Sequence, residues 1–151
     1  MLNPRLKEFL ETNHVPYRAI PHRPAYTAME AAQSMHVPGQ DMAKTVIVDL
    51  DGRLAMAVVP GTKHVSLARL EKATGASHAR IAHEGEFRFD FPDCEVGAMP
   101  PFGNLFNMEV LVDRQLTEDA EIVFNGGDHS EAVRMTYQDF ERLVHPTVLA
   151  L

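Results

Sequence analysis

The sequence predicts one α/β domain of the α+β type, in which helices surround a mixed, largely antiparallel, curved and barrel-like sheet. Its 151 residues, 45% of them hydrophobic, fit a single domain that buries about 70% of its unfolded surface. Most strand-like segments are joined by short turns, which is typical of hairpins. Segments with helix-start signals flank these strands, as expected for helices that cover a sheet. With no internal repeat and only short loops, residues 1–151 are expected to form one domain.

Helix caps and one hairpin signal define the N-terminal half. Asn3-Pro4 pairs an N-cap with a proline at the first helical position, and Thr27 forms a T-x-x-E capping box with Glu30. Asp51-Gly52 separates two β-rich runs, which is a strong signal for a two-residue hairpin turn. Both runs are almost entirely apolar, so we expect a central hairpin covered on both faces. The expected elements are a helix from residue 4, a strand within 16–22, a helix over 28–35, the hairpin over 43–61, a helix over 66–75 and a strand over 78–82.

The C-terminal half predicts a rigid loop, three strands and a last helix. Residues 97–104 read GAMPPFGN, and two prolines between glycines exclude a helix or an interior strand. Asn-Gly-Gly at 125–127 is typical of a turn between strands. Thr136 and Asp139 predict the cap of the last helix, which Pro146 stops. The expected elements are a short helix or turn over 83–91, strands over 105–113, 120–125 and 129–137, and a helix over 137–144.

Charge and composition exclude several classes of function. The net charge is −7, whereas an extended grip on DNA normally shows a basic footprint, so we expect no DNA partner. Contact with only one end of an RNA stays open, because a few local contacts suffice there. The chain has no long apolar run and no signal-peptide block, and its one cysteine, Cys94, excludes an intramolecular disulfide. These features predict a cytoplasmic protein with no membrane partner.

Three stretches could carry chemistry. Lys44 lies at the mouth of an apolar strand, where it is either a solvated charge or a cation at a pocket rim, and composition alone favours the solvated charge. The 97–104 loop is either a plain crossover or a preorganised backbone that lines a cleft, and composition again favours the plain role. His129 follows Gly126-Gly127, which leave room for a ligand beside it, although a lone histidine is more often structural.

Common catalytic and cofactor motifs are missing from the sequence. We find no H-E-x-x-H, G-x-G-x-x-G, Walker lysine or G-x-S-x-G pattern, so we expect no metal and no nucleotide cofactor. Cys94 lies between Asp93 and Glu95, whose negative charges would raise its thiol pKa and weaken it as a nucleophile. We therefore interpret Cys94 as structural.

Three motifs in order nevertheless resemble one family, the YbaK/ProX aminoacyl-tRNA deacylases, which include the editing domain inserted in bacterial prolyl-tRNA synthetases. The matching segments are AKTVIV, GAMPPFG and GGDHSEAVRM, and the likeness runs from Thr27 to the last helix. The G-x-x-x-P motif of the family falls on Gly97 and Pro101, and its G-x-H motif ends on His129. Its strand-initial lysine falls on Lys44.

The resemblance implies a YbaK-like fold and a trans-acting deacylase. Such an enzyme hydrolyses the ester of a mischarged tRNA with a positioned water and help from the substrate, without a cofactor. The resemblance implies that Lys44, Gly97, Pro101 and His129 are catalytic. The substrate-binding residues that it implies are Thr27, Thr45, Met99, Pro100, Phe102, Gly103, Asp113, Gly126 and Gly127.

Two departures and one alternative qualify these expectations. Some relatives have asparagine where this chain has Thr45, and a small polar residue where it has Pro100, so the specificity of a relative is not carried over. The acidic balance leaves tRNA capture to acceptor-end contacts alone or to delivery by a synthetase partner. The alternative is a non-catalytic regulatory module that binds an aminoacyl or nucleotide-like ligand in the same cleft. In either case Lys44, the 97–101 backbone and His129 should converge on one cleft.

Overall fold

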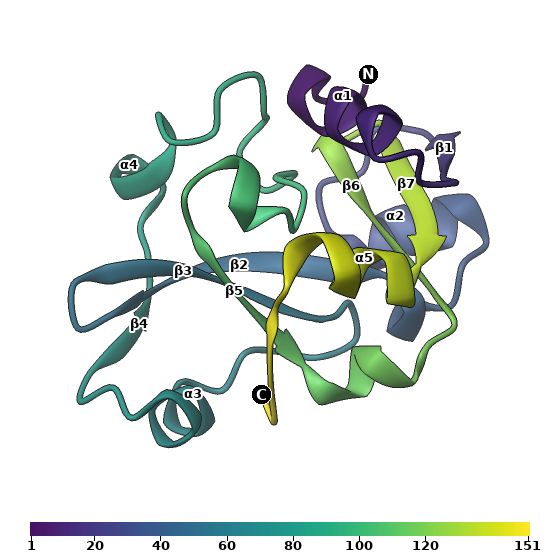
Figure 1. Ribbon diagram of the computed structural model, residues 1–151. Helices are drawn as coiled ribbons and strands as arrows, with labels where there is room; N and C mark the ends of the chain where they lie inside the picture. The colour runs from purple at the N-terminus through teal and green to yellow at the C-terminus, as the bar shows by residue number, and fades with distance from the viewer.

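A computed structural model describes all of residues 1–151 and arranges eight strands in two sheets (Figure 1). The smaller sheet has the order β1-β7-β6, and the larger one has the order β4-β2-β3-β5-β8. A single bridge between Met42 and Val123 connects them. The strand bounds are β1 Arg18–Pro21, β2 Ala43–Leu50, β3 Arg53–Pro60, β4 Ala79–Ile81, β5 Glu109–Asp113, β6 Glu121–Asp128, β7 Glu131–Thr136 and β8 Thr147–Leu149.

Five α-helices begin where the sequence predicts caps or helix starts. The Asn3 side chain accepts from the N–H groups of Arg5 and Leu6, and the Thr27 hydroxyl accepts from Glu30 N–H. The Glu30 carboxylate accepts from Tyr26 N–H, one residue before the predicted partner of the capping box. The helix bounds are α1 Pro4–Thr12, α2 Ala28–Met35, α3 Leu67–Thr74, α4 Glu84–Phe87 and α5 Tyr137–Val144. None of these helices combines the length and the apolarity that crossing a bilayer requires.

The predicted central hairpin is confirmed. Asp51 and Gly52 have φ angles of 53° and 93°, the left-handed geometry of a tight hairpin turn. β2 lies between β4 and β3, and β3 lies between β2 and β5, so neither strand is at an edge. Because the strands are interior, the sequence of β3 is apolar on both faces, and six of its eight residues are buried.

The sheet differs from the prediction in three respects. The strands form two sheets that do not close into a barrel. The segment 105–113 is a strand only from Glu109, and it runs parallel to β3 in the larger sheet. A short 3₁₀ helix, Arg114–Glu118, separates it from β6, so the two strands form no hairpin. The three-residue strand β8 was not predicted and pairs in parallel with β5. Four strand pairs are antiparallel, so the sheets are mixed and largely antiparallel as expected.

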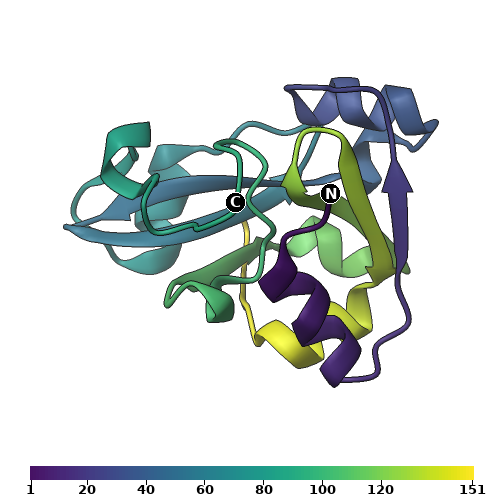
Figure 2. The same cartoon turned by 90° about the horizontal axis from the view of Figure 1, so that it is seen from above.

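Alternating side chains give each sheet two packed faces. On β6, Phe124 faces the main core together with α1 and α5, whereas Val123 faces α2. In Figure 2, α1 and α5 accordingly lie on one side of β6 and β7, and α2 lies on the other. On β3, Val58 faces the main core and Ala57 faces α3. The main core therefore lies between the two sheets, and α2 covers the outer face of the smaller sheet next to the start of β2.

Candidate functional site

A cleft of about 690 Å³ opens where the two sheets meet. Its walls come from five segments that are distant in sequence: the N-terminal end of α2, the start of β2, the turn after β3, the loop that begins at Gly97, and β6. Thr27, Lys44, Thr45 and Met99 contribute side chains to its lining. The cleft therefore brings the predicted cation, the start of the rigid loop and the N-cap of α2 to one place.

Close backbone packing fixes one side of this cleft. Gly61, in the turn after β3, donates its N–H to the carbonyl of Met42 at 2.6 Å. A Cβ atom at Gly61 would lie 2.9 Å from the carbonyl oxygen of Gly39 and 3.3 Å from Cβ of Ala28, the first residue of α2. Only glycine permits this approach without a shift of the neighbouring backbone. The N-terminal end of α2 thus rests directly on the end of the hairpin.

Lys44 supplies a cation without an internal counter-ion. It is half-buried in the cleft wall, opposite Val59 in the β2–β3 register. None of the salt bridges of the protein includes it. Burial lowers the pKa of the Lys44 ammonium, because desolvation disfavours its charged form. A partly desolvated, unpaired ammonium attracts an anionic or carbonyl oxygen more strongly than a solvated lysine does.

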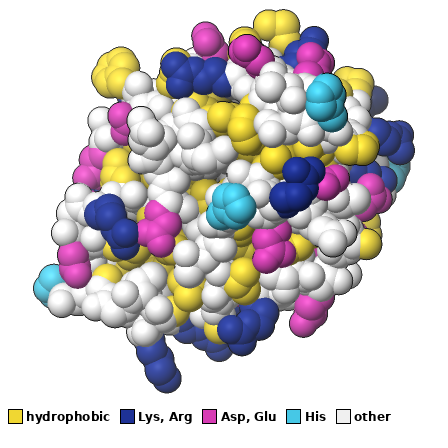
Figure 3. Space-filling model, in the orientation of Figure 1, with side chains coloured by type: hydrophobic (Ala, Val, Ile, Leu, Met, Phe, Trp, Pro, Cys, Tyr) yellow, Lys and Arg dark blue, Asp and Glu magenta, His cyan; other side chains and the backbone are white.

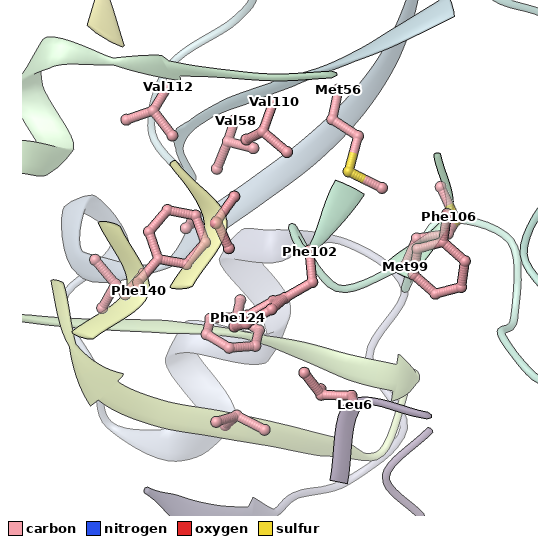
Figure 4. Close-up of a cluster of buried hydrophobic side chains, with 14 of the residues drawn as sticks. Leu6, Met56, Val58, Met99, Phe102, Phe106, Val110, Val112, Phe124 and Phe140 are labelled. Carbon is pink, nitrogen blue, oxygen red and sulfur yellow. The ribbon is translucent and has the colours of Figure 1, made fainter. Parts of the chain in front are cut away.

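The GAMPPFGN loop is anchored in the core at its far end. Phe102 is fully buried, with its ring centroid 5.5 Å from that of Phe124 and 5.6 Å from that of Phe140 (Figure 4). A Cβ atom at Gly103 would overlap the carbonyl oxygen of Met108. At the near end, Gly97 has a φ angle of 88°. The loop is therefore fixed by packing beyond the prolines, and its first residues face the cleft.

His129 holds the start of this loop in place. Its Nε2 lies 2.9 Å from the carbonyl oxygen of Val96, and a carbonyl only accepts, so Nε2 carries the proton. Its backbone N–H donates to Oε1 of Glu95 at 2.9 Å, and the N–H of Glu95 donates to the Gly127 carbonyl at 2.7 Å. We call this set of three hydrogen bonds the clasp. The clasp joins the segment before Gly97 to the turn that carries His129.

The turn itself differs from the prediction. Gly126 and Gly127 form a bulge within β6, and the reversal falls at Asp128–Glu131, where one carboxylate oxygen of Asp128 accepts from the N–H groups of Ser130 and Glu131. The reason is the N-terminal segment. Asn3 donates its N–H to Gly126 at 2.7 Å, and a Cβ at Gly127 would lie 2.9 Å from Cβ of Asn3. The glycines therefore make room for the N-terminal segment that leads into α1.

Five of the predicted site residues line the cleft, namely Thr27, Lys44, Thr45, Gly97 and Met99. The His129 ring packs against Gly97: a Cβ atom added to Gly97 would lie 3.4 Å from Cε1 of His129. The lysine and the loop start thus line one cleft, and the histidine supports the loop start without lining the cleft itself.

The other predicted site residues lie outside the cleft lining. Pro100, Pro101, Phe102 and Gly103 are buried, and Gly126 and Gly127 pack under the N-terminus. Asp113 is buried, binds Lys63 at 2.9 Å and accepts from the N–H of Leu151 at 3.2 Å. Several residues that the family motifs indicated are therefore buried residues that hold the loop and the turn in place.

The cleft also contains residues that the sequence did not indicate, namely Tyr26, Met29, Thr62, His64 and Asn125. The amide oxygen of Asn125 is buried without a hydrogen-bond partner. A buried amide oxygen normally finds a donor, so a ligand donor is the natural partner here. The only sequence signal was its place before Gly126, which indicated a turn and not a cleft wall.

Cys94 does not provide a nucleophile. Burial is the main cause that raises the pKa of its thiol to about 11, and the charge of Asp93 acts in the same direction. The thiol also accepts from the Asn3 side chain at 3.3 Å, which opposes the rise only in part. At neutral pH this sulfur is protonated, and the thiolate is the reactive form.

A sequence model of the family described as aminoacyl-tRNA editing domain matches residues 22–143. The prolyl-tRNA editing protein ProX of Acetoanaerobium sticklandii is 26% identical over 142 residues, which cover 89% of this chain and 85% of that protein. The proline–tRNA ligase of Bacillus mycoides is 24% identical over 84 residues. That match covers 56% of this chain but only 15% of the ligase, so the chain corresponds to a small part of such ligases.

Solved structures share the fold. A candidate trans-editing enzyme for prolyl tRNA synthetase superimposes with a TM-score of 0.84 at 23% identity, covering 100% of this chain and 98% of that one. The hypothetical protein APE2540 has the same TM-score and identity over 97% of both chains. Both identities are low, so these similarities establish the fold alone.

Proposed function

The chain belongs to the aminoacyl-tRNA editing domain family, and on that premise we propose that it is a trans-acting deacylase of mischarged aminoacyl-tRNA. The observation that carries the proposal is the convergence of Lys44, the loop start at Gly97 and the clasp of His129 on one cleft. The relative from Acetoanaerobium sticklandii, of which the match covers 85%, is named as a prolyl-tRNA editing protein, which agrees with this activity.

The reaction is hydrolysis of the ester between an amino acid and a terminal ribose. The oxygen of a water molecule bonds to the ester carbonyl carbon, and the bond from that carbon to the ribose oxygen breaks. One water proton ends on the ribose oxygen, and the neighbouring ribose hydroxyl assists the attack. Because an aminoacyl ester is already reactive, positioning and polarisation suffice, and positioning alone supplies roughly 7–11 kcal/mol in favourable cases.

In this proposal the residues of the cleft have separate roles. Lys44 attracts the oxygens of the terminal nucleotide, since its ammonium has no other partner. The backbone at Gly97 and the side chain of Met99 form the wall against which the acyl group and the water lie. His129 sets the position of that wall through Val96, and so limits the size of the acyl group.

The proposed partner is the acceptor end of an aminoacyl-tRNA. On the face shown in Figure 3, acidic and basic side chains are interspersed, without the continuous basic stripe of an extended RNA grip. With a net charge of −7, the protein is suited to grip one end of the RNA or to receive it from a synthetase. Because translation supplies such a substrate, we propose that the protein acts in the cytoplasm.

A deacylation screen tests the proposal. Wild-type protein should release a small amino acid from at least one of the Ala-, Ser-, Cys- or Pro-charged tRNAs. Lys44→Ala should lower the rate by about 100-fold or more, as the loss of one well-placed electrostatic group does. Lys72→Ala is the matched control, because Lys72 is an exposed lysine of α3 outside the cleft. If the wild type binds these tRNAs but releases no amino acid from any of them, the protein is the non-catalytic module instead.

A further inference from the structure

Apolar side chains gather at the mouth of the cleft although they are exposed. The protein has six exposed large hydrophobic residues, and three of them, Tyr26, Met29 and Val96, belong to this rim. Tyr26 and Met29 line the cleft, and Val96 directly precedes Gly97. Single exposed apolar residues are ordinary, but a group beside a pocket marks a contact surface.

The ring of Tyr26 is held in place with much of its surface in solvent. It packs against His129 with the ring centroids 4.8 Å apart and a tilt of 47°, yet the residue is 71% exposed. Its backbone is also fixed, because Ala25 donates to the His129 carbonyl at 2.9 Å and Tyr26 N–H donates to Glu30. One face of the ring therefore rests on the imidazole, and the rest of it is free for a ligand.

We propose that Tyr26 is the stacking platform for the base of the unpaired 3′-terminal nucleotide of the tRNA. This inference rests on the proposed function. The aromatic ring of Tyr26 and the unpaired ammonium of Lys44 line the same cleft. A nucleotide matches this pair, because its base can stack on Tyr26 while its phosphate lies near Lys44. Stacking tolerates any base because every base has a π face. An acidic protein thus gains affinity for an RNA end without a basic surface.

The test measures binding of a fluorescent single-stranded RNA oligonucleotide with a 3′ end like that of tRNA. Loss of one base–aromatic contact in Tyr26→Ala should weaken binding by about 5- to 150-fold. Tyr26→Phe keeps the π face and should bind as the wild type does. Tyr26→Leu keeps apolar area without a π face and should resemble Tyr26→Ala. The same RNA with an abasic 3′-terminal position should bind the wild type and Tyr26→Ala equally.

A second readout shows whether Tyr26→Ala merely displaces His129. Amide hydrogen exchange at His129 and Glu95, whose N–H groups belong to the clasp, should be equally slow in the wild type and Tyr26→Ala if the clasp is intact. Equal RNA binding by these two proteins, or no measurable binding by the wild type, overturns the stacking proposal. Stacking still stands if Tyr26 controls RNA binding while no aminoacyl-tRNA is hydrolysed, in which case the deacylase proposal alone fails.

Discussion

Two lysines at the same end of the central hairpin have opposite environments. Lys44 lies at the start of β2, and Lys63 lies three residues beyond the end of β3. Lys63 forms an ion pair at 2.9 Å with Asp113, whose side chain is only 3% exposed. Lys44 has no ion pair, and burial lowers its pKa. One lysine neutralises a buried carboxylate of the fold, whereas the other retains a charge that the fold does not use.

This difference separates residues that the fold needs from residues that a ligand needs. A buried carboxylate without its cation is costly, so Asp113 and Lys63 contribute to stability as a unit. An ammonium that loses water without gaining a partner is slightly unfavourable for folding, so an advantage outside folding must explain Lys44. The comparison predicts that substitutions at the Asp113–Lys63 pair mainly lower stability, whereas substitutions at Lys44 mainly lower activity.

The largest change in stability is expected from Asp113→Ala. The substitution removes a buried anion that accepts from both Lys63 and the N–H of Leu151. We expect a loss of about 3 kcal/mol, which for a chain of this size lowers Tm by about 6–12 °C in thermal unfolding. Glu109→Ala is the control, because Glu109 forms a more exposed pair with Arg53. Equal losses of Tm in the two variants would contradict the structural role that we assign to the Asp113–Lys63 pair.

A smaller effect, confined to activity, is expected at Glu95. Glu95→Ala removes the acceptor of the His129 N–H, one of the three hydrogen bonds of the clasp, so deacylation should fall about 10- to 100-fold, as misplacement of a site does. Glu95→Gln keeps an oxygen acceptor and should restore most of the rate. Because Glu95 is exposed, the Tm of both variants should stay near that of the wild type. A parallel loss of rate in both variants would contradict the role of the clasp.

Lys44→Met should stabilise the protein slightly while it lowers the deacylation rate as much as Lys44→Ala does. Removal of a desolvated, unpaired charge should raise stability by about 0.5 kcal/mol, or about 1–2 °C in Tm. Since the pKa of Lys44 is lowered in the folded state, the unfolded chain holds this proton more tightly, and wild-type stability gains as pH rises towards the ordinary lysine pKa of about 10.4. The Tm gap between Lys44→Met and wild type should therefore narrow with rising pH. A wider gap would show that Lys44 is paired.

The smallest effect is expected from alkylation of the cysteine. With the pKa of its thiol raised to about 11, Cys94 should react little with iodoacetamide in the folded protein at neutral pH. The deacylation rate should then be unchanged after treatment. Full labelling in urea is the control for reagent activity. Rapid inactivation of the folded protein, with one alkyl group on Cys94, would show a thiol with a role in catalysis.

Local signals predicted the elements, and non-local contacts decided the rest. The caps at Asn3 and Thr27 and the turn at Asp51-Gly52 act within a few residues, so the sequence reveals them. The split into two sheets and the strand β8 depend on pairings between distant segments, which no local pattern encodes. The family motif identified the loop that begins at Gly97, but only the packing of Phe102 shows which part of that loop is anchored in the core.

The contact at Gly61 makes the width of the cleft depend on a single glycine in its wall. This glycine is the spacer between the helix that begins at Ala28 and the hairpin, and one added methyl group there would act as a wedge. Such a wedge would push the start of α2 away from the end of the hairpin. The width of the cleft therefore depends on a backbone contact, whereas its positive charge depends on Lys44.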